Sequence, residues 1–274
     1  MVLPTYFHQL EFNHLINLVH TYGVLIKPST IKFNSQQGGA NKEYKFDNYT
    51  FNVSISKQDG RIHIAVLTPK EDECVTIFID NKEAIIHNMS YDKQCAKEGL
   101  KKPGGGDILM KFMLDFLKKN KDKLKIKRIL LTDYSYLVCP GCDENIKLAR
   151  LRMITHGETW YMKYGFKPYN TLKQQPDDVL LKGIDINKKI RNKLSVNQIN
   201  IIKLAKEHKN IDMREIKRLI DKYVLIKDFI IRLSKEFSKY CYLIEYIMKQ
   251  IYDPPLLEKR LMIDYYGKSL YLDI

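Results

Sequence analysis

The chain has 274 residues, 45% of them hydrophobic and 28% charged, which is enough for one full-sized core and a smaller second unit. This composition excludes a disordered, collagen-like or low-complexity protein. The formal net charge of +14 favours a polyanionic partner, such as a nucleotide, a nucleic acid or another phosphorylated ligand.

Membrane insertion and secretion are both disfavoured by the sequence. No window approaches the roughly eighteen consecutive apolar residues of a membrane span, and the first residues lack a positive region followed by an apolar run. The five cysteines are odd in number and scattered, which favours reduced thiols over a disulfide framework. We therefore expect a soluble protein without a membrane partner, in the cytoplasm or alternatively in the nucleus.

The first half of the chain predicts one helix followed by a sheet. Apolar residues at near-helical spacing predict an amphipathic helix over residues 5–20. From residue 43 to 91 the pattern changes to period two, with turn signals such as Asp59-Gly60, and we expect four antiparallel strands. A helix over 107–120 and a strand over 127–136 complete a strand–helix–strand unit.

The second half becomes increasingly helical. A helix is expected over 144–154, and Thr155-x-x-Glu158 predicts a capping box for a short helix that ends at Gly165. Strand signals vanish beyond about residue 185. Residues 186–274 hold 19 Lys and Arg against 11 Asp and Glu, a net charge of +8. We expect a mixed α+β domain over 1–183 and a basic, all-helical C-terminal domain over 184–274.

A run of three glycines between a predicted strand and a predicted helix is the strongest candidate ligand site. Backbone N–H groups can converge there on an anion such as a pyrophosphate, because no side chains obstruct it. The run matches neither a Walker A loop nor G-x-G-x-x-G, and a flexible connection is the alternative. The residues that we assign to this anion site are Lys101, Lys102, Gly104, Gly105, Gly106 and Asp107.

The order of these elements resembles the GNAT superfamily of acyl-CoA-dependent N-acyltransferases. Lys101-x-x-Gly104-x-Gly106 is similar to the family signature Gln/Arg-x-x-Gly-x-Gly/Ala, with Lys in the first place. Tyr161-x-Lys163-x-Gly165-Phe166 matches a later stretch that closes the family core. The resemblance covers roughly residues 44–170. It implies a mixed, mostly antiparallel sheet flanked by helices. The amino-acid composition, which is rich in Lys, Ile, Asn and Tyr, is typical of an AT-rich genome, such as that of a virus or protist.

The resemblance also implies an activity. Acetyl-CoA or a related acyl-CoA would be the co-substrate, with its pyrophosphate on the 101–107 loop and its pantetheine arm along the backbone near Met89 and Tyr91. The acceptor would be an amine: a protein lysine, a protein N-terminus or a small molecule. The alternative is a non-enzymatic nucleic-acid-binding protein that uses a degenerate form of the same fold.

Acyl transfer from a thioester to an amine requires a proton for the departing thiolate and a base for the amine. Tyr161 occupies the position of the tyrosine that commonly supplies this proton in GNAT-like proteins, and a phenol is protonated at neutral pH. Glu83 and His87 on the fourth predicted strand are the candidate bases. Each residue also has a structural alternative. Tyr161 could be buried for its large apolar area, His87 could be a structural residue with its hydrogen bonds satisfied, and Glu83 could be a solvated surface charge.

Two further features leave alternatives open. Cys139-Pro140-Gly141-Cys142 could supply two zinc ligands or a redox pair, but no second such pair completes a tetrahedral site, so we assign no metal. The basic C-terminal helices could contact nucleic acid, dock a substrate protein, or serve as a solvated structural cap.

Overall fold

The computed structural model describes residues 40–274 apart from 59, 102–103, 140–144, 207–210 and 254–260. The predicted helix over 5–20 lies outside the described residues. The chain divides into a first unit, Met1–Thr132 with Leu270–Ile274, and a second unit, Asp133–Ser269. This division differs from the expected boundary at 183, because the residues after 132 pack with the later helices and the last residues return to the first unit.

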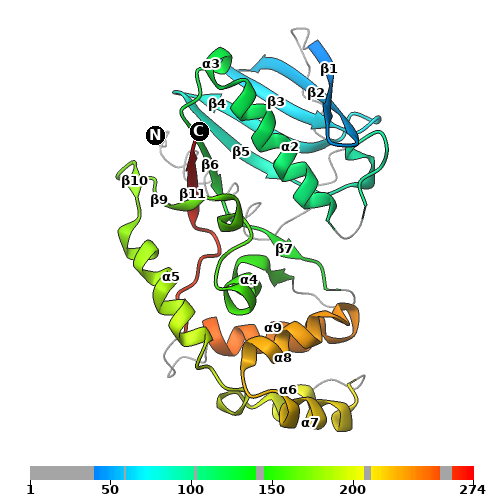
Figure 1. The fold of residues 1–274 in the computed structure, drawn as a ribbon, viewed down its shortest axis with the longest axis vertical. Helices are drawn as coiled ribbons and strands as arrows, with labels where there is room; N and C mark the ends of the chain where they lie inside the picture. Colours follow the sequence, from blue (N-terminus) through cyan, green and yellow to red (C-terminus); the bar gives the residue numbers. More distant parts are fainter. Residues whose placement is uncertain (1–39, 59, 102–103, 140–144, 207–210, 254–260) are drawn as a thin grey trace, which may run out of the picture. The chain divides into compact units, whose positions relative to one another are not determined.

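A sheet dominates the first unit (Figure 1). Its neighbouring strands follow the order β1-β2-β3-β4-β5-β6-β11. Strands β1 to β5 are antiparallel, whereas β6 runs parallel to β5. The bounds are β1 Ala40–Phe46, β2 Tyr49–Gln58, β3 Arg61–Leu67, β4 Glu73–Asp80, β5 Glu83–Met89, β6 Arg128–Thr132 and β11 Ser269–Asp273. The α+β class with a large, mostly antiparallel sheet is therefore confirmed.

The antiparallel part contains one strand more than the four that we expected. Asp47 has a positive φ of 49° and turns the chain, so that Phe46 pairs with Tyr49. The segment that we took for a first strand is thus a hairpin of β1 and β2. Glu83 and His87 consequently lie on β5, the fifth strand of the described chain.

One face of this sheet is covered by α2 (Gly105–Lys119), which is followed by α3 (Lys121–Leu124) (Figure 1). The Phe112 ring stacks on Phe51 with the ring centroids 4.0 Å apart, and Phe116 meets Tyr44 edge to face. Side chains alternate between the faces of a strand, so the buried Phe51 and Val53 of β2 share the face that packs on this helix. The helix that precedes β6 is thereby fixed against the sheet by aromatic packing.

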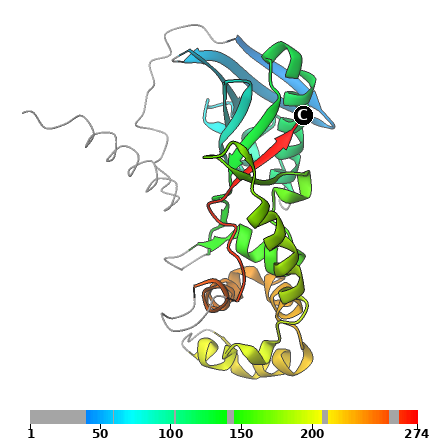
Figure 2. The same ribbon diagram turned by 90° about the vertical axis from the view of Figure 1, so that its left-hand side faces the viewer.

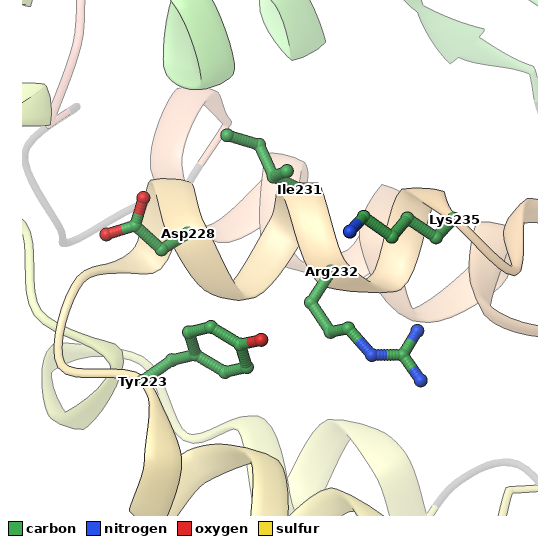
Figure 3. Close-up of a pocket in the computed structure, with 5 residues that line it drawn as sticks. All are labelled: Tyr223, Asp228, Ile231, Arg232 and Lys235. Atoms are coloured by element: carbon green, nitrogen blue, oxygen red, sulfur yellow. The ribbon is translucent and has the colours of Figure 1, made fainter.

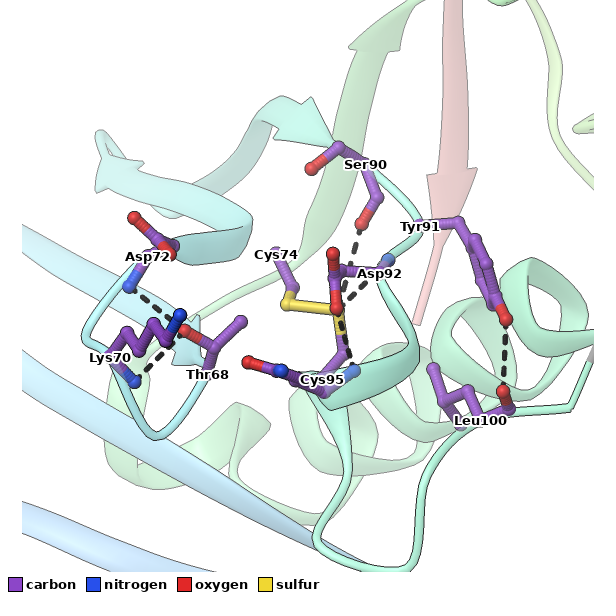
Figure 4. Close-up of a disulfide and its surroundings, with 10 residues drawn as sticks. Thr68, Lys70, Asp72, Cys74, Ser90, Tyr91, Asp92, Cys95 and Leu100 are labelled. Atoms are coloured by element: carbon purple, nitrogen blue, oxygen red, sulfur yellow. Dashed lines mark hydrogen bonds between the residues drawn. A yellow bond between two sulfur atoms is a disulfide. The ribbon is translucent and has the colours of Figure 1, made fainter. Parts of the chain in front are cut away.

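The connection between β5 and α2 is fastened to the sheet at two points. Cys95, in the 3₁₀ turn η2 (Lys93–Cys95), forms a disulfide with Cys74 of β4 (Figure 4). The Glu98 carboxylate accepts hydrogen bonds from Thr50 N–H at 2.7 Å and from the Thr50 hydroxyl at 2.8 Å. The disulfide and these hydrogen bonds fix the position of the segment that leads to the glycine run.

The second unit is built mainly from helices. Figures 1 and 2 show α8 and α9 packed side by side, and their buried apolar faces meet in one core. The helices are α4 Leu148–His156, α5 Asp178–Arg191, α6 Ile201–Lys206, α7 Met213–Lys222, α8 Ile226–Ser234 and α9 Phe237–Tyr252. The 3₁₀ turns are η3 Met162–Tyr164 and η4 Val196–Gln198, and the short strands are β7 Tyr136–Leu137, β8 Ile146–Lys147, β9 Lys167–Asn170 and β10 Gln175–Pro176.

Two expectations for this part of the chain are corrected. The segment after residue 184 is not all helical, because Ser269–Asp273 forms β11. Thr155 does not cap a new helix: it lies in the last turn of α4, where its hydroxyl donates to the Leu151 carbonyl at 2.7 Å. Gly157, with φ of 81°, then ends α4.

The expectation of reduced thiols is also wrong. Cys139 pairs with Cys241 of α9, in addition to the pairing of Cys74 with Cys95, and all four sulfur-bearing side chains are buried. Cys142 lies outside the described residues. The cysteine count therefore does not support a reducing compartment, since disulfides form and persist in oxidising surroundings.

Within the described part of the chain, no helix is both long enough and apolar enough to pass through a bilayer.

Candidate functional site

The parallel ladder between β5 and β6 is short. It joins Glu83 with Arg128 at one end and Ile86 with Leu131 at the other, although β5 continues to Met89. The register between β4 and β5 shifts at the same place, where His87 is the extra residue of a β-bulge. The last three residues of β5 therefore lie beyond the ladder with β6, on the side where the chain proceeds toward α2.

The glycine run forms the start of α2. Gly104 has φ of 108°, a value that L side chains rarely adopt, and it is exposed with no heavy atom within 4 Å of an added Cβ. Gly105 is buried, because the Tyr91 ring lies against it and the Tyr91 hydroxyl donates to the Leu100 carbonyl at 2.9 Å (Figure 4). Gly106 follows within the first helical turn. Two of the glycines are thus required by backbone conformation and by close packing.

The charges at the start of α2 favour the binding of an anion. The first-turn N–H groups and the helix dipole give the start of α2 a partial positive charge. Asp107, which we assigned to the anion site, forms an ion pair with Lys111 at 2.8 Å and raises the pKa of that lysine. Lys101 is exposed beside the run, whereas Lys102 lies outside the described residues.

The candidate bases occupy β5 but differ in surroundings. Glu83 Oε1 lies 3.8 Å from Arg128 Nη1 on the neighbouring strand. His87 is exposed, and its ring meets Phe78 edge to face with the centroids 5.8 Å apart. Met89, near the predicted pantetheine position, is half-buried. The structure thus brings Glu83 and His87 onto the strand that adjoins β6.

Tyr161 belongs to the second unit and is 8% exposed. Its ring contacts Trp160 and Phe166, with centroid separations of 4.9 and 6.2 Å. Burial raises the pKa of its phenol, and the negative charge of Asp133 raises it further. Tyr161 is therefore a packing residue that buries a large aromatic ring, and its phenol also keeps its proton at neutral pH.

Asp133 is a polar residue that the sequence did not single out. It is fully buried, and it accepts hydrogen bonds on Oδ1 from Ser135 N–H at 3.2 Å and from the Ser135 hydroxyl at 2.5 Å. Burial raises its pKa to about 6, although the hydrogen bonds from Ser135 act in the opposite direction. An aspartate directly after a strand is typical of a turn, so no sequence signal distinguishes it.

The disulfide of Cys139 decides between the alternatives for the Cys139–Cys142 segment. A cysteine bonded to Cys241 is neither a thiolate zinc ligand nor the redox partner of Cys142. The zinc and C-x-x-C redox interpretations are both excluded for this state of the protein.

An open pocket of about 290 Å³ lies in the second unit beside α8 (Figure 3). Its lining residues are Tyr223, Asp228, Ile231, Arg232 and Lys235. None of the residues predicted from the sequence lines it, and its arginine is already bonded to Glu236 at 2.5 Å. This pocket does not belong to the candidate site.

In comparisons with protein-family models, with curated proteins and with solved structures, nothing matches this chain.

Proposed function

We propose that the protein is an N-acyltransferase that moves an acyl group, acetyl in the simplest case, from acyl-CoA to an amine. The observation that carries this proposal lies within the first unit: the parallel strands β5 and β6, whose ladder ends at Ile86, are connected by a helix with three glycines at its start. An extended ligand arm can bond to a strand beyond a ladder end, while a diphosphate binds at a helix N-terminus.

The geometry of α2 supports a diphosphate ligand in particular. Gly104 is exposed and has open space around its α-carbon, so a phosphate group can approach the backbone closely. The exposed Lys101 adds positive charge, and Lys111 neutralises Asp107. An anion at this position would meet N–H donors without a competing carboxylate.

The reaction requires one proton acceptor and one proton donor. The neutral amine attacks the thioester carbonyl, the C–N bond forms, and the C–S bond breaks with its electron pair on sulfur. In our proposal His87 or Glu83 removes a proton from the amine, and the resemblance to GNAT proteins assigns the proton for the sulfur to Tyr161. The raised pKa keeps the Tyr161 phenol protonated at neutral pH, so that a proton is present to donate, although it also makes the phenol a weaker acid.

Calorimetric titration of the full chain with acetyl-CoA tests the proposal, with ATP as a control for generic attraction of polyanions. We expect acetyl-CoA to bind at least about tenfold more tightly than ATP at moderate salt, a difference of about 1.4 kcal/mol. Gly104→Val should weaken binding. Gly60→Val is a matched control, because Gly60 also has positive φ and open space around it. Equal affinities for the two ligands, lost equally with added salt, would contradict the proposal.

Tyr161→Phe tests the proton donor separately. The substitution removes one hydroxyl and keeps the ring that packs against Trp160 and Phe166. Turnover should fall by about 100-fold or more, as is typical of a lost general acid, while the affinity for acetyl-CoA stays nearly constant. Turnover equal to that of the wild type would remove Tyr161 from the mechanism.

A second candidate, nucleic-acid binding, is favoured by the surface of α7. Four of its cationic side chains are exposed: Arg214, Lys217, Arg218 and Lys222. Binding through phosphate contacts would weaken steeply as salt increases and would survive substitutions at Gly104 and Gly106. Removal of two of these charges, in Lys217→Gln with Arg218→Gln, should reduce the salt dependence if α7 is the contact.

A further inference from the structure

The pocket beside α8 lies entirely within the second unit, where α7 ends and α8 begins (Figure 3). Tyr223, which follows the last residue of α7, contributes its aromatic ring to the lining, and α8 contributes the other side chains. Ligand pockets usually hold about 300–1,000 Å³, so a volume of about 290 Å³ is at the small end of that range. This pocket has room for one flat ring system rather than for a folded partner.

The segment that carries Tyr223 is held in place by backbone hydrogen bonds. The Tyr223 N–H donates to the Leu219 carbonyl at 3.0 Å and closes the last turn of α7. The carbonyl of the next residue, Val224, accepts a hydrogen bond from Val196 N–H at 3.0 Å. A binding group whose backbone is already ordered loses less conformational entropy when a ligand binds. The position of the Tyr223 ring is therefore set before any ligand arrives.

The surroundings of the Tyr223 ring suit a nucleobase. The ring is half-buried, and Lys222 Nζ lies 5.6 Å from the ring centroid, over its face. Figure 3 shows the phenol oxygen directed toward the Arg232 side chain. Proteins bind single-stranded nucleic acid by stacking bases on such aromatic rings while neighbouring cations meet the phosphates.

The charged side chains of the pocket leave donors and acceptors for a ligand. Arg232 Nη2 bonds Glu236 at 2.5 Å and lies 3.9 Å from a Glu215 oxygen, but a guanidinium has five N–H donors. Lys235 is exposed at the same pocket and adds a second cation. The Asp228 carboxylate can accept a hydrogen bond from an N–H group at the edge of a base. The pocket thus offers partners for both the base and its phosphate.

A row of exposed cations leads along α7 to this pocket. The row consists of Arg214, Lys217, Arg218 and Lys222. It covers about 12 Å from the first residue to the last, since an α-helix rises about 1.5 Å per residue. Asp221 is exposed on the same helix, so the row keeps a surplus of positive charge. Its last member, Lys222, is the residue that lies over the Tyr223 ring.

We propose that the end of α7 binds single-stranded nucleic acid, with one base stacked on Tyr223 in the pocket and the phosphates on the α7 cations. This inference rests on the second candidate function, nucleic-acid binding, and not on acyl transfer. Phosphate contacts alone would bind single strands and duplexes alike. A base inside a duplex has its faces covered by its neighbours and cannot enter a pocket without leaving the stack. The Tyr223 pocket therefore makes the surface selective for single strands.

Fluorescence anisotropy tests this selectivity on the full chain, with a labelled oligothymidylate as the single strand and its duplex with oligoadenylate as the comparison. At one moderate salt concentration, we expect the wild type to bind the single strand at least about fivefold more tightly, the contribution of one stacked base. Equal affinities for the two forms would overturn the inference and leave nucleic-acid binding intact. Binding of neither form would overturn both.

Substitutions at Tyr223 test the stacking. Tyr223→Leu keeps an apolar side chain without a ring, so the affinity for the single strand should fall by about 5- to 150-fold while that for the duplex stays within about twofold. Tyr223→Phe keeps the ring and should bind as the wild type does. Tyr164→Leu is the matched control, because Lys163 Nζ lies 4.7 Å from the centroid of the Tyr164 ring, yet Tyr164 does not line the pocket. Unchanged single-strand affinity in Tyr223→Leu, or an equal loss in Tyr164→Leu, would overturn the inference.

Photo-crosslinking of the wild type provides the test if Tyr223→Leu fails to fold. The probe is the same oligonucleotide with 5-iodouracil in place of thymine, since this base couples on irradiation to an aromatic side chain stacked on it. Trypsin cuts after Lys222 and Lys227 and releases the peptide 223–227, in which Tyr223 is the one aromatic residue. We expect the cross-linked nucleotide on that peptide. Cross-links that fall only on other peptides would overturn the inference.

Discussion

The ring of Tyr91 lies against the α-carbon of Gly105 so closely that a Cβ added there would be 2.1 Å from Tyr91 Cε2. The Tyr91 hydroxyl is held by the Leu100 carbonyl, and the connection that contains Leu100 is fastened to the sheet through Cys95 and Glu98. The ring therefore has little freedom to move away. This contact explains why the second of three adjacent glycines is required for a packing reason rather than for ligand approach.

Gly105→Ala should consequently destabilise the protein. Overpacking of this kind costs about 1–3 kcal/mol, and urea unfolding of the purified variant measures it. Gly60→Ala is the comparison, because its added methyl group meets no neighbour and only the positive φ penalises it. A Gly105→Ala variant no less stable than Gly60→Ala would show that the Tyr91 ring can move.

Arg150 holds together a buried ion cluster in the second unit. Its guanidinium is 5% exposed and bonds both Asp253 and Asp264. Arg150→Met leaves two carboxylates without their counter-charge, so we expect a loss of about 3–5 kcal/mol in the free energy of unfolding. Arg214→Met, at a side chain that is 96% exposed, should change stability by less than about 0.5 kcal/mol. Similar denaturation midpoints for the two variants would contradict this expectation.

Glu98 links stability to pH. Two hydrogen bonds from Thr50 lower the pKa of Glu98 below its ordinary value of 4.5, and the bond from the backbone N–H has a larger effect than the bond from the hydroxyl. The unfolded chain therefore binds the proton more readily than the folded chain does. The stabilisation by the carboxylate is complete above pH 4.5 and is lost as the pH falls through the lower, folded value.

Glu98→Gln should accordingly be less stable than the wild type at pH 7, and the difference should shrink as the pH falls below 4.5. Urea unfolding at a series of pH values measures both curves. Glu71→Gln, at an exposed glutamate of the same unit, is the control for loss of one negative charge. A gap that stays constant between pH 7 and pH 3 would show that the charge of Glu98 plays no part.

The two disulfides predict a simple labelling pattern. The native protein, treated with iodoacetamide in the absence of reductant, should carry at most one label by mass spectrometry, because Cys142 is the only cysteine of the sequence outside the two pairs. Reduction under denaturing conditions should then expose all five thiols. Loss of the Cys74–Cys95 link in Cys74→Ala with Cys95→Ala should cost about 3 kcal/mol. Several labels on the unreduced native protein would contradict the pairing.

Much of the local structure was predictable because local signals and tertiary packing agree. The period-two pattern after residue 60 marks β3, β4 and β5, and the turn after Asp80 falls where the structure has it. Gly165, with φ of 92°, ends a short turn before β9 as expected. Asp212 caps α7 by accepting from Arg214 N–H. In each case the residue acts on neighbours within a few positions of itself.

The errors arise where a local pattern has two outcomes. Asp47-Asn48 makes a hairpin turn inside a run that alternates like one strand, so β1 and β2 were merged. Thr155 matched a capping box, yet its hydroxyl bonds back to Leu151 within α4. Asp and Asn occur in turns as well as at helix caps, and a Thr hydroxyl can either cap a helix or bond to a carbonyl inside one.

For the candidate site, the sequence by itself determined the glycine run, its lysines and the aromatic stretch around Tyr161, because these depend on residue type and order. Only the tertiary structure decided the cysteine pairing, the β5–β6 ladder that stops at Ile86, and the burial of Asp133. Burial and pairing join residues far apart in the chain, such as Cys139 and Cys241, 102 positions apart. The free energy of an ionised carboxyl group depends on the medium and charges around it, which sequence neighbours do not reveal.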